Sequence, residues 1–163
     1  MRTHTTIDSP TGPLTLVADE NGALTGVYME NQRHRPPQET FGHPDPEPFA
    51  EAVAQLREYF AGERREFTVP LALDGTPFQR TVWQALCEIP YGETVSYGQL
   101  AERLGKPNAS RAVGLANGKN PVSIIVPCHR VVGANGSLTG YGGGLGRKRQ
   151  LLDFERGVLP VLV

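Results

Sequence analysis

The sequence predicts an α+β protein in which a small N-terminal α/β domain precedes a mostly helical C-terminal domain. Its length of 163 residues suits one domain or two small ones. Near the N-terminus, short segments separated by turn residues are typical of strands. Farther along the chain, the apolar residues are spaced as in helices. Charge also divides the chain, because residues 1–74 hold 6 Lys and Arg against 12 Asp and Glu, and residues 75–163 hold 10 against 5. We therefore predict domains at 1–74, linker included, and at 75–163.

Composition excludes several classes of protein. Apolar residues make up 39% and charged residues 20% of the chain, and no apolar run approaches the ~20 residues of a membrane-spanning helix. The polar N-terminus lacks the apolar stretch of a signal peptide. Two cysteines are too few for a disulfide scaffold or a four-cysteine zinc site. We expect a cytoplasmic protein whose basic half meets a polyanion, with an ordinary solvated surface as the alternative.

The first domain contains predicted strands and one helix. Turn residues separate three strands, at 3–8, 14–19 and 23–29. Polar, proline-rich residues 31–48 predict a loop. Asp45 is the predicted cap of the helix that follows, in which apolar residues from Phe49 to Phe60 recur at spacings of three and four. Residues 67–73 are a further candidate strand, and no residue of this domain suggests catalysis.

The second domain begins with a clearly marked helix. Thr76 is the predicted cap, Pro77 takes the first helical position, and Gln79 completes a capping box. The apolar stripe of this helix continues to Ile89, and residues 90–92 form a turn.

Two shorter helices follow. Ser96 opens the first through a second capping-box pattern, and the helix runs to Leu104. After Gly105, Asn108 is the predicted cap of the next helix, which ends near Asn117. Two short helices joined by a few residues that include Gly match a helix-turn-helix, although many helical hairpins bind nothing.

The second helix of this pair carries small residues and one strong cation. Small side chains such as Ala109 and Ala112 allow close approach of the backbone but read base edges poorly. Together with Arg111 they favour groove fitting and phosphate contact over direct base readout.

A reactive cysteine is the most informative feature of the sequence. Residues 122–126 are apolar and rich in β-branched side chains, which predicts a buried strand that leads to Cys128. A thiol is a nucleophile only as thiolate, and the neighbouring His129 and Arg130 favour that form. Glu155 is a candidate to orient the histidine. The alternative is a small buried hydrophobe, and this is how we interpret Cys87, which has no such neighbours.

A glycine-rich loop occupies residues 140–146. It lacks the Lys-Ser/Thr pair of a phosphate-binding Walker loop. It either wraps a flat substrate against the thiol or serves as a linker. A metal site is a poor interpretation, because Cys128 and His129 are adjacent and the other histidines are scattered through the acidic half.

Several motifs occur in a fixed order between residues 76 and 157. They are IPYGETVSY at 89–97, RAVG at 111–114, NP at 120–121, PCHRVV at 127–132, and Tyr141 with the glycine loop. Their order and spacing resemble the O6-alkylguanine-DNA alkyltransferases, also called methylated-DNA–protein-cysteine methyltransferases. Residues 1–74 are compatible with the variable N-terminal domain of that family.

The resemblance implies a DNA repair protein with a winged-type helix-turn-helix. Such a protein binds duplex DNA through the minor groove and flips the damaged guanine into a pocket. The alkyl group passes from guanine O6 to the sulfur of Cys128, each molecule acts once, and no cofactor takes part. The expected protein is a monomer.

The resemblance also implies roles for individual residues. His129 removes the thiol proton through a water, Glu155 polarises the histidine, Tyr97 protonates the leaving guanine, and Arg111 fills the gap left by the flipped base. The remaining expected site residues are Asn120, which ties the DNA-binding and catalytic elements together, the DNA contacts Ala109, Ala112, Tyr97 and Arg130, and the pocket residues Tyr141, Gly142, Gly143 and Val131.

Two departures and two alternatives accompany this resemblance. Some members hold zinc in the N-terminal domain through cysteines that are absent here, so no metal is expected. Some members have a serine where Gly142 stands, which removes one donor near the substrate oxygen. A sensor of alkylated DNA that performs no repair is the first alternative, although such relatives replace the reactive cysteine. A cysteine hydrolase or thiol oxidoreductase is the second, although the chain has no CxxC pair.

Overall fold

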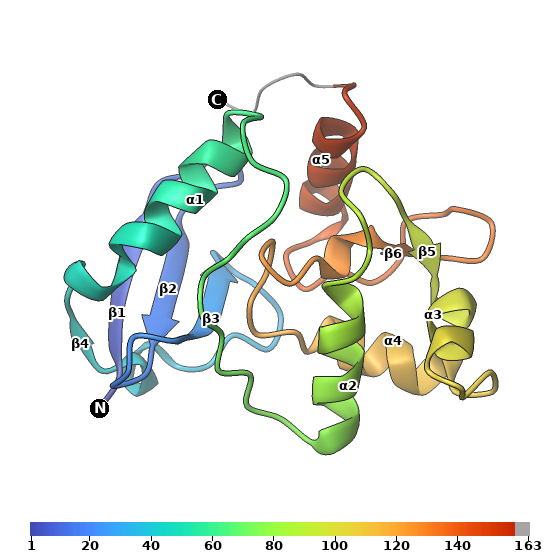
Figure 1. Cartoon of the computed structure of the whole chain (residues 1–163), viewed down its shortest axis with the longest axis horizontal. Coiled ribbons are helices and arrows are strands. Elements are labelled where there is room, and N and C mark those ends of the chain that lie inside the picture. Colours follow the sequence, from blue (N-terminus) through green and yellow to red (C-terminus); the bar gives the residue numbers. More distant parts are fainter. Residues whose placement is uncertain (159–163) are drawn as a thin grey trace.

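A four-stranded sheet and one helix form the N-terminal part of the computed structural model, which describes residues 1–158 (Figure 1). The sheet has the order β3-β2-β1-β4, in which β1, β2 and β3 are antiparallel neighbours and β4 runs parallel to β1. The strands are β1 (Thr3–Ile7), β2 (Leu14–Ala18), β3 (Leu24–Met29) and β4 (His43–Pro44). Helix α1 (Ala50–Phe60) lies beside the sheet and buries Leu56, Tyr59 and Phe60 in the same apolar core as the strands.

The segment predicted as a loop at 31–48 contains short regular pieces. These are the 3-10 helices η1 (Gln38–Phe41) and η2 (Glu47–Phe49), with β4 between them. Asp45 does not cap α1 as predicted, because its carboxylate accepts from the backbone N–H of Glu47 at 3.1 Å, before η2. Phe49 stands at the start of α1 without a side-chain cap.

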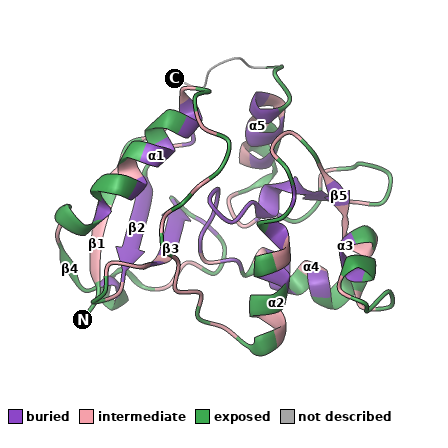
Figure 2. Cartoon of the chain, viewed as in Figure 1, coloured by how far each residue is buried: buried purple, intermediate pink, exposed green. Residues whose placement is uncertain are grey.

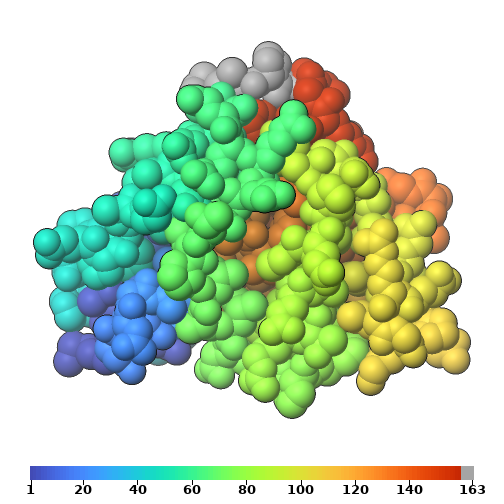
Figure 3. Space-filling model, in the orientation of Figure 1, coloured from blue at the N-terminus to red at the C-terminus, as the bar shows by residue number. Residues whose placement is uncertain are grey.

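The strand predicted at 67–73 is wrong. Only an isolated bridge joins Leu71 to Leu24, with hydrogen bonds on either side of it. The chain after α1 instead runs extended across the face of the molecule toward α2, as Figures 1 and 3 show. This segment links the N-terminal sheet to the helical part.

The remaining elements are mostly helical, which confirms the predicted α+β class. Both predicted capping boxes are present: Thr76 with Gln79 opens α2, and Ser96 with Gln99 opens α3. The elements are α2 (Pro77–Leu86), β5 (Val95–Ser96), α3 (Tyr97–Arg103), α4 (Ser110–Gly118), η3 (Cys128–Arg130), β6 (Val131–Val132) and α5 (Leu145–Glu155). Strands β5 and β6 pair in parallel.

Three local predictions differ from this structure. Residues 122–126 form a tight turn with a single bridge from Val122 to Val27, and Ile124 has a positive φ of 73°. Asn108 precedes α4 without capping it, since Ala109 occupies the cap position. The glycine-rich loop ends at Gly144, whose φ of 95° suits glycine, and α5 begins there although the sequence analysis did not predict it.

One core joins the two parts of the chain. Buried residues of the sheet, α1, α2, α4, α5 and the segment before Cys128 belong to a single apolar cluster (Figure 2). Trp83 of α2 is 2% exposed, and its indole N–H donates to the carbonyl oxygen of Ala116 in α4 at 2.8 Å. Within residues 1–158, no helix has the length and apolar character needed to cross a membrane. The last five residues of the predicted second domain lie outside the described residues.

Candidate functional site

Cys128 lies at the start of η3, where a buried asparagine holds the preceding turn in place. The side chain of Asn120 donates to the carbonyl oxygen of Val126 at 2.8 Å and accepts from the N–H of Val122 at 3.0 Å. These bonds replace those that a partner strand would supply, which explains why the apolar run forms a turn. Asn117 donates to the carbonyl oxygen of Cys128 at 3.3 Å. The cysteine is therefore fixed from both sides and is 5% exposed.

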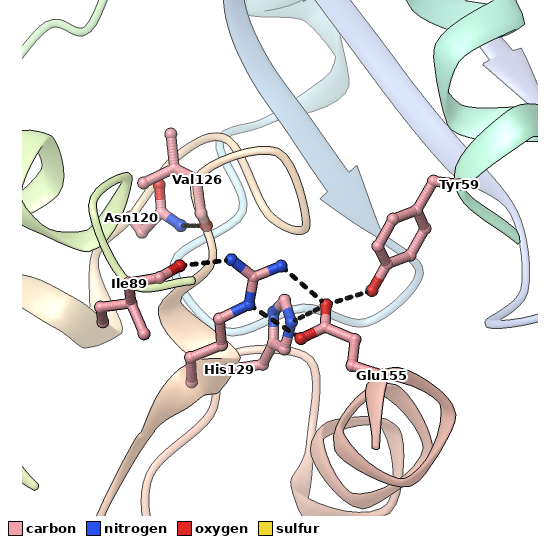
Figure 4. Close-up of polar contacts among 7 residues, drawn as sticks. Tyr59, Ile89, Asn120, Val126, His129 and Glu155 are labelled. Carbon is pink, nitrogen blue, oxygen red and sulfur yellow. Dashed lines mark hydrogen bonds and ion pairs between the residues drawn. The ribbon is translucent and has the colours of Figure 1, made fainter. Parts of the chain in front are cut away.

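His129 and Glu155 form a buried pair beside this cysteine. His129 Nε2 lies 2.8 Å from Glu155 Oε2, and both side chains are fully buried (Figure 4). A carboxylate only accepts hydrogen bonds, so Nε2 carries the proton and Nδ1 is the basic atom of the neutral ring. Nδ1 is buried and has no hydrogen-bond partner among the described residues. The tertiary structure thus brings Glu155 to the histidine, as predicted.

Arg130 belongs to the same buried network and does not face solvent. Its Nε donates to Glu155 Oε1 at 2.8 Å and its Nη2 to Oε2 at 3.0 Å, while Nη1 donates to the carbonyl oxygen of Ile89 at 2.7 Å. The residue is 5% exposed. The prediction that Arg130 contacts DNA is therefore wrong for this arrangement, because the guanidinium is committed inside the protein.

A residue of the N-terminal domain completes the network. The hydroxyl of Tyr59, on α1, donates to Glu155 Oε2 at 2.5 Å (Figure 4). Tyr59 is fully buried among aromatic rings. The sequence analysis missed this residue, and its spacing within α1 marks it only as a core position.

Electrostatics keep the carboxyl group of Glu155 ionised. Burial by itself raises the pKa of this group, but the hydrogen bonds and charges of His129 and Arg130 lower it further than burial raises it. The net result is a pKa well below the usual value of 4.5. Glu155 is thus a charged acceptor next to the histidine throughout the neutral range.

The thiol of Cys128, in contrast, is held in its neutral form. Burial raises its pKa from 9.0 to about 11, while a hydrogen bond with Asn120 and the charge of Lys148 act in the opposite direction. Lys148, on α5, is itself buried and donates to the carbonyl oxygens of Val131 and Thr139 at 2.5 and 2.7 Å. Burial lowers the pKa of its ammonium group from 10.5 to about 8. A thiol of this kind reacts at neutral pH only where a base takes its proton.

Tyr97 stands between α4 and the glycine-rich loop. Its hydroxyl donates to the carbonyl oxygen of Thr139 at 3.1 Å, and a Cβ added to Gly114 would lie 3.6 Å from its ring. Tyr97 is therefore close to the loop that the sequence analysis assigned to the substrate pocket.

The glycine-rich loop is held by the N-terminal domain. The backbone N–H of Arg33 donates to the carbonyl oxygen of Gly142 at 2.8 Å. Tyr141, Gly142 and Gly143 line a cleft of about 640 Å³ together with residues 30, 31 and 33 and Arg147. Cys128 does not line this cleft, and Val131, the other predicted pocket residue, is fully buried in β6, where it pairs with Val95 of β5.

Three of the predicted DNA-contacting residues lie in α4 or at its start. Arg111 and Ala112 are exposed and Ala109 is half-buried. Leu115, one turn after Arg111, is 66% exposed, which is unusual for a leucine in a helix that buries Val113 and Ala116. This side of α4 therefore presents one cation, an apolar side chain and small residues.

Cys87 is not a packing residue as predicted. It is exposed at the end of α2. Among residues 1–158, no group of three or more His, Cys, Asp or Glu side chains is arranged to hold a metal ion.

Comparisons with known proteins match most of the chain, in both its N-terminal and its C-terminal part. The family model for the ribonuclease-like domain of 6-O-methylguanine DNA methyltransferase matches residues 3–73, and the model for the DNA binding domain matches residues 77–157. A methylated-DNA–protein-cysteine methyltransferase of Mycobacterium tuberculosis is 58% identical over 157 residues, which covers 96% of this chain and 94% of that protein. One of Methanosarcina acetivorans is 52% identical over 148 residues, 91% of this chain and 94% of that protein.

A solved structure is similar throughout. The crystal structure of Mycobacterium tuberculosis OGT in complex with DNA superposes with a TM-score of 0.89 and 58% sequence identity. The match covers 95% of this chain and 93% of that chain.

Proposed function

Since the chain belongs to the 6-O-methylguanine DNA methyltransferase family, which repairs DNA by alkyl transfer to a protein cysteine, we propose that its acceptor is the sulfur of Cys128. The observation that carries this assignment is the buried His129–Glu155 pair, in which His129 directly follows Cys128 in the sequence. The other cysteine, Cys87, is exposed and contacts no such pair.

His129 acts as the base that generates the thiolate. Burial raises the pKa of the Cys128 thiol to about 11, so the thiol is protonated at pH 7 unless a base takes its proton. The unpartnered Nδ1 of His129 accepts the thiol proton, directly or through one water, and Glu155 Oε2 stabilises the resulting imidazolium. Lys148 adds a positive charge near the sulfur, which favours the thiolate.

The transfer itself is a displacement at saturated carbon. The thiolate attacks the alkyl carbon on guanine O6, so that an S–C bond forms as the C–O bond breaks and its electron pair stays on the guanine. The product is a thioether, which has no leaving group suited to regeneration, and each protein molecule acts once. Fixing Cys128 through Asn120 supplies the in-line geometry that this displacement needs.

The guanine anion must gain a proton, and Tyr97 is placed to give one. Its hydroxyl donates to the carbonyl oxygen of Thr139, directly before the glycine-rich loop. A guanine base lying against that loop can take over this hydrogen bond. The donor position left open by Gly142 is then supplied by backbone N–H groups of the loop.

DNA recognition is assigned to α3 and α4 as a helix-turn-helix that enters the minor groove. The exposed side of α4 carries small residues that allow close approach, and Arg111 fills the gap left by the flipped base. The protein works as a monomer in the cytoplasm. DNA affinity that does not fall with increasing salt would contradict this mode of binding, because phosphate contacts release counterions.

The test is a mass measurement on the intact protein after mixing with a duplex that carries one O6-methylguanine. We expect a gain of one methyl group, located on the Cys128 peptide and saturating at one per protein. Cys128→Ser should gain nothing, and the matched variant Cys87→Ser should behave as wild type. Tight binding to the damaged duplex without any gain in mass would instead indicate a sensor, and multiple turnover on an ester or disulfide would indicate a different thiol enzyme.

A further inference from the structure

We propose that Tyr59 is a positioning residue for the alkyl transfer, through which the N-terminal domain holds the carboxylate of Glu155 against His129. This inference rests on the proposed role of Cys128 and His129. It assigns to α1 a part in the chemistry, although every residue implicated so far lies after residue 76.

The contact is specific in its geometry. The Tyr59 hydroxyl donates to Oε2 of Glu155, which is the same oxygen that receives Nε2 of His129. Arg130 reaches both carboxylate oxygens from the other side, at 2.8 and 3.0 Å. Glu155 is therefore held by three side chains from two separate regions of the chain, and only Tyr59 comes from the N-terminal domain (Figure 4).

The packing around Tyr59 leaves its hydroxyl one direction to point. The ring meets Phe60 and Phe154 edge-on, with centroids 5.2 and 5.5 Å away, and Tyr59 is fully buried. A buried hydroxyl needs a partner, and Glu155 is the partner that the structure supplies. Oε2 thus takes part in three hydrogen bonds, with His129, Arg130 and Tyr59.

The hydroxyl remains a hydrogen-bond donor to Oε2, the oxygen that faces the imidazole of His129. Burial and the nearby carboxylate raise the pKa of Tyr59 well above 10.0, so it remains a donor at all working pH values. The other charged or titratable groups near this contact are His129, Arg130 and Tyr91, with Arg65 over the ring of Tyr91. Removing the hydroxyl takes one of three donors from Oε2, so the carboxylate is held less firmly against Nε2 of His129 and stabilises the imidazolium less well.

The test is Tyr59→Phe, which keeps the ring and removes only the hydroxyl. The rate constant for a single methyl transfer is measured against pH under saturating alkylated duplex. We expect a plateau lowered about tenfold, on the scale of one hydrogen bond to a charged group, and an acidic limb displaced from that of wild type. The affinity for the alkylated duplex should equal that of wild type, because Tyr59 is buried far from the exposed side of α4.

The matched control is Tyr91→Phe. Its ring lies 6.1 Å from that of Tyr59, and its hydroxyl makes no hydrogen bond among the described residues, so its profile should match wild type. A second measurement combines Tyr59→Phe with Glu155→Gln, where loss of the hydroxyl should change the rate less than twofold because both changes act on one contact.

Two results would overturn the inference about Tyr59, and only one of them would also overturn the proposed function. A Tyr59→Phe protein with reduced stability but an unmoved pH profile would show that the hydroxyl serves the core alone, while the role of Cys128 stands. A wild-type protein that transfers no methyl group would remove both the proposed function and this inference.

Discussion

Replacing Arg130 by Met tests whether this arginine serves the buried network or the DNA. Methionine fills a similar volume without charge. The change removes three hydrogen bonds, two to Glu155 and one to the carbonyl oxygen of Ile89. The side chains of the pair are 6% and 0% exposed, so water cannot replace the lost partner.

The expected cost is large for a protein of this size. Removing one member of a buried ion pair costs about 3–5 kcal/mol, because the remaining charge is left uncompensated. The free energy of unfolding of a natural domain is only about 5–15 kcal/mol in total. At roughly 2–4 °C per kcal/mol for a chain of this length, the melting temperature should fall by about 6–20 °C.

The assay pairs calorimetry and urea unfolding with a DNA-binding titration. Arg156→Met is the matched control, because Arg156 is exposed and makes only a 3.4 Å contact with Thr94, and its melting temperature should stay within a degree or two of wild type. The double variant Arg130→Met with Glu155→Gln should lose less stability than the two single losses together. An unchanged melting temperature with weakened DNA binding would refute the reasoning and return Arg130 to the DNA surface.

Three further predictions follow from the same structure. Asn120→Ala should lower the free energy of unfolding by about 1–3 kcal/mol, measured by urea unfolding, because the backbone at Val122 and Val126 loses its hydrogen-bond partner. The same change should slow methyl transfer, and an unaffected rate would show that the turn holds Cys128 without Asn120. The pKa of Glu155 is lowered on folding, so its stabilisation is complete above its usual pKa of 4.5 and is lost as pH falls below that value. The stability difference between wild type and Glu155→Gln should therefore shrink in acid, and a constant difference would contradict the ion pair. Arg111→Ala should weaken repair of a duplex more than attack on a free O6-alkylguanine, with equal losses indicating a role in folding or chemistry.

Local signals in the sequence were sufficient for several elements. The capping boxes at Thr76 and Ser96 are visible because each involves residues only three positions apart, and the structure confirms the helices that they open. The adjacent Cys128 and His129 were recognisable for the same reason. Glu155 was a candidate partner of the histidine from the residues, the family resemblance gave it a role, and the structure places it 2.8 Å from His129.

Other predicted elements failed because hydrogen bonds and packing that the residue pattern does not display decide their structure. Residues 122–126 have the composition of a strand, but the buried side chain of Asn120 satisfies their backbone, and a turn forms. Residues 67–73 have no strand beside them apart from one bridge at Leu71. Helix α5 was missed because its mostly polar sequence lacks an apolar stripe, and its buried Lys148 donates to backbone carbonyl oxygens 9 and 17 residues earlier.

The sequence by itself therefore determined the α+β class, the reactive cysteine with its histidine, and the family. Only the tertiary structure decided that Arg130 is an internal residue and that Tyr59, 96 positions before Glu155, donates to the same carboxylate. Capping and nucleophile motifs depend on neighbours within a few residues, which a sequence displays directly. The protonation and orientation of a buried carboxylate depend on every charge and donor that folding places around it, and for Glu155 those come from two separate segments, α1 and η3.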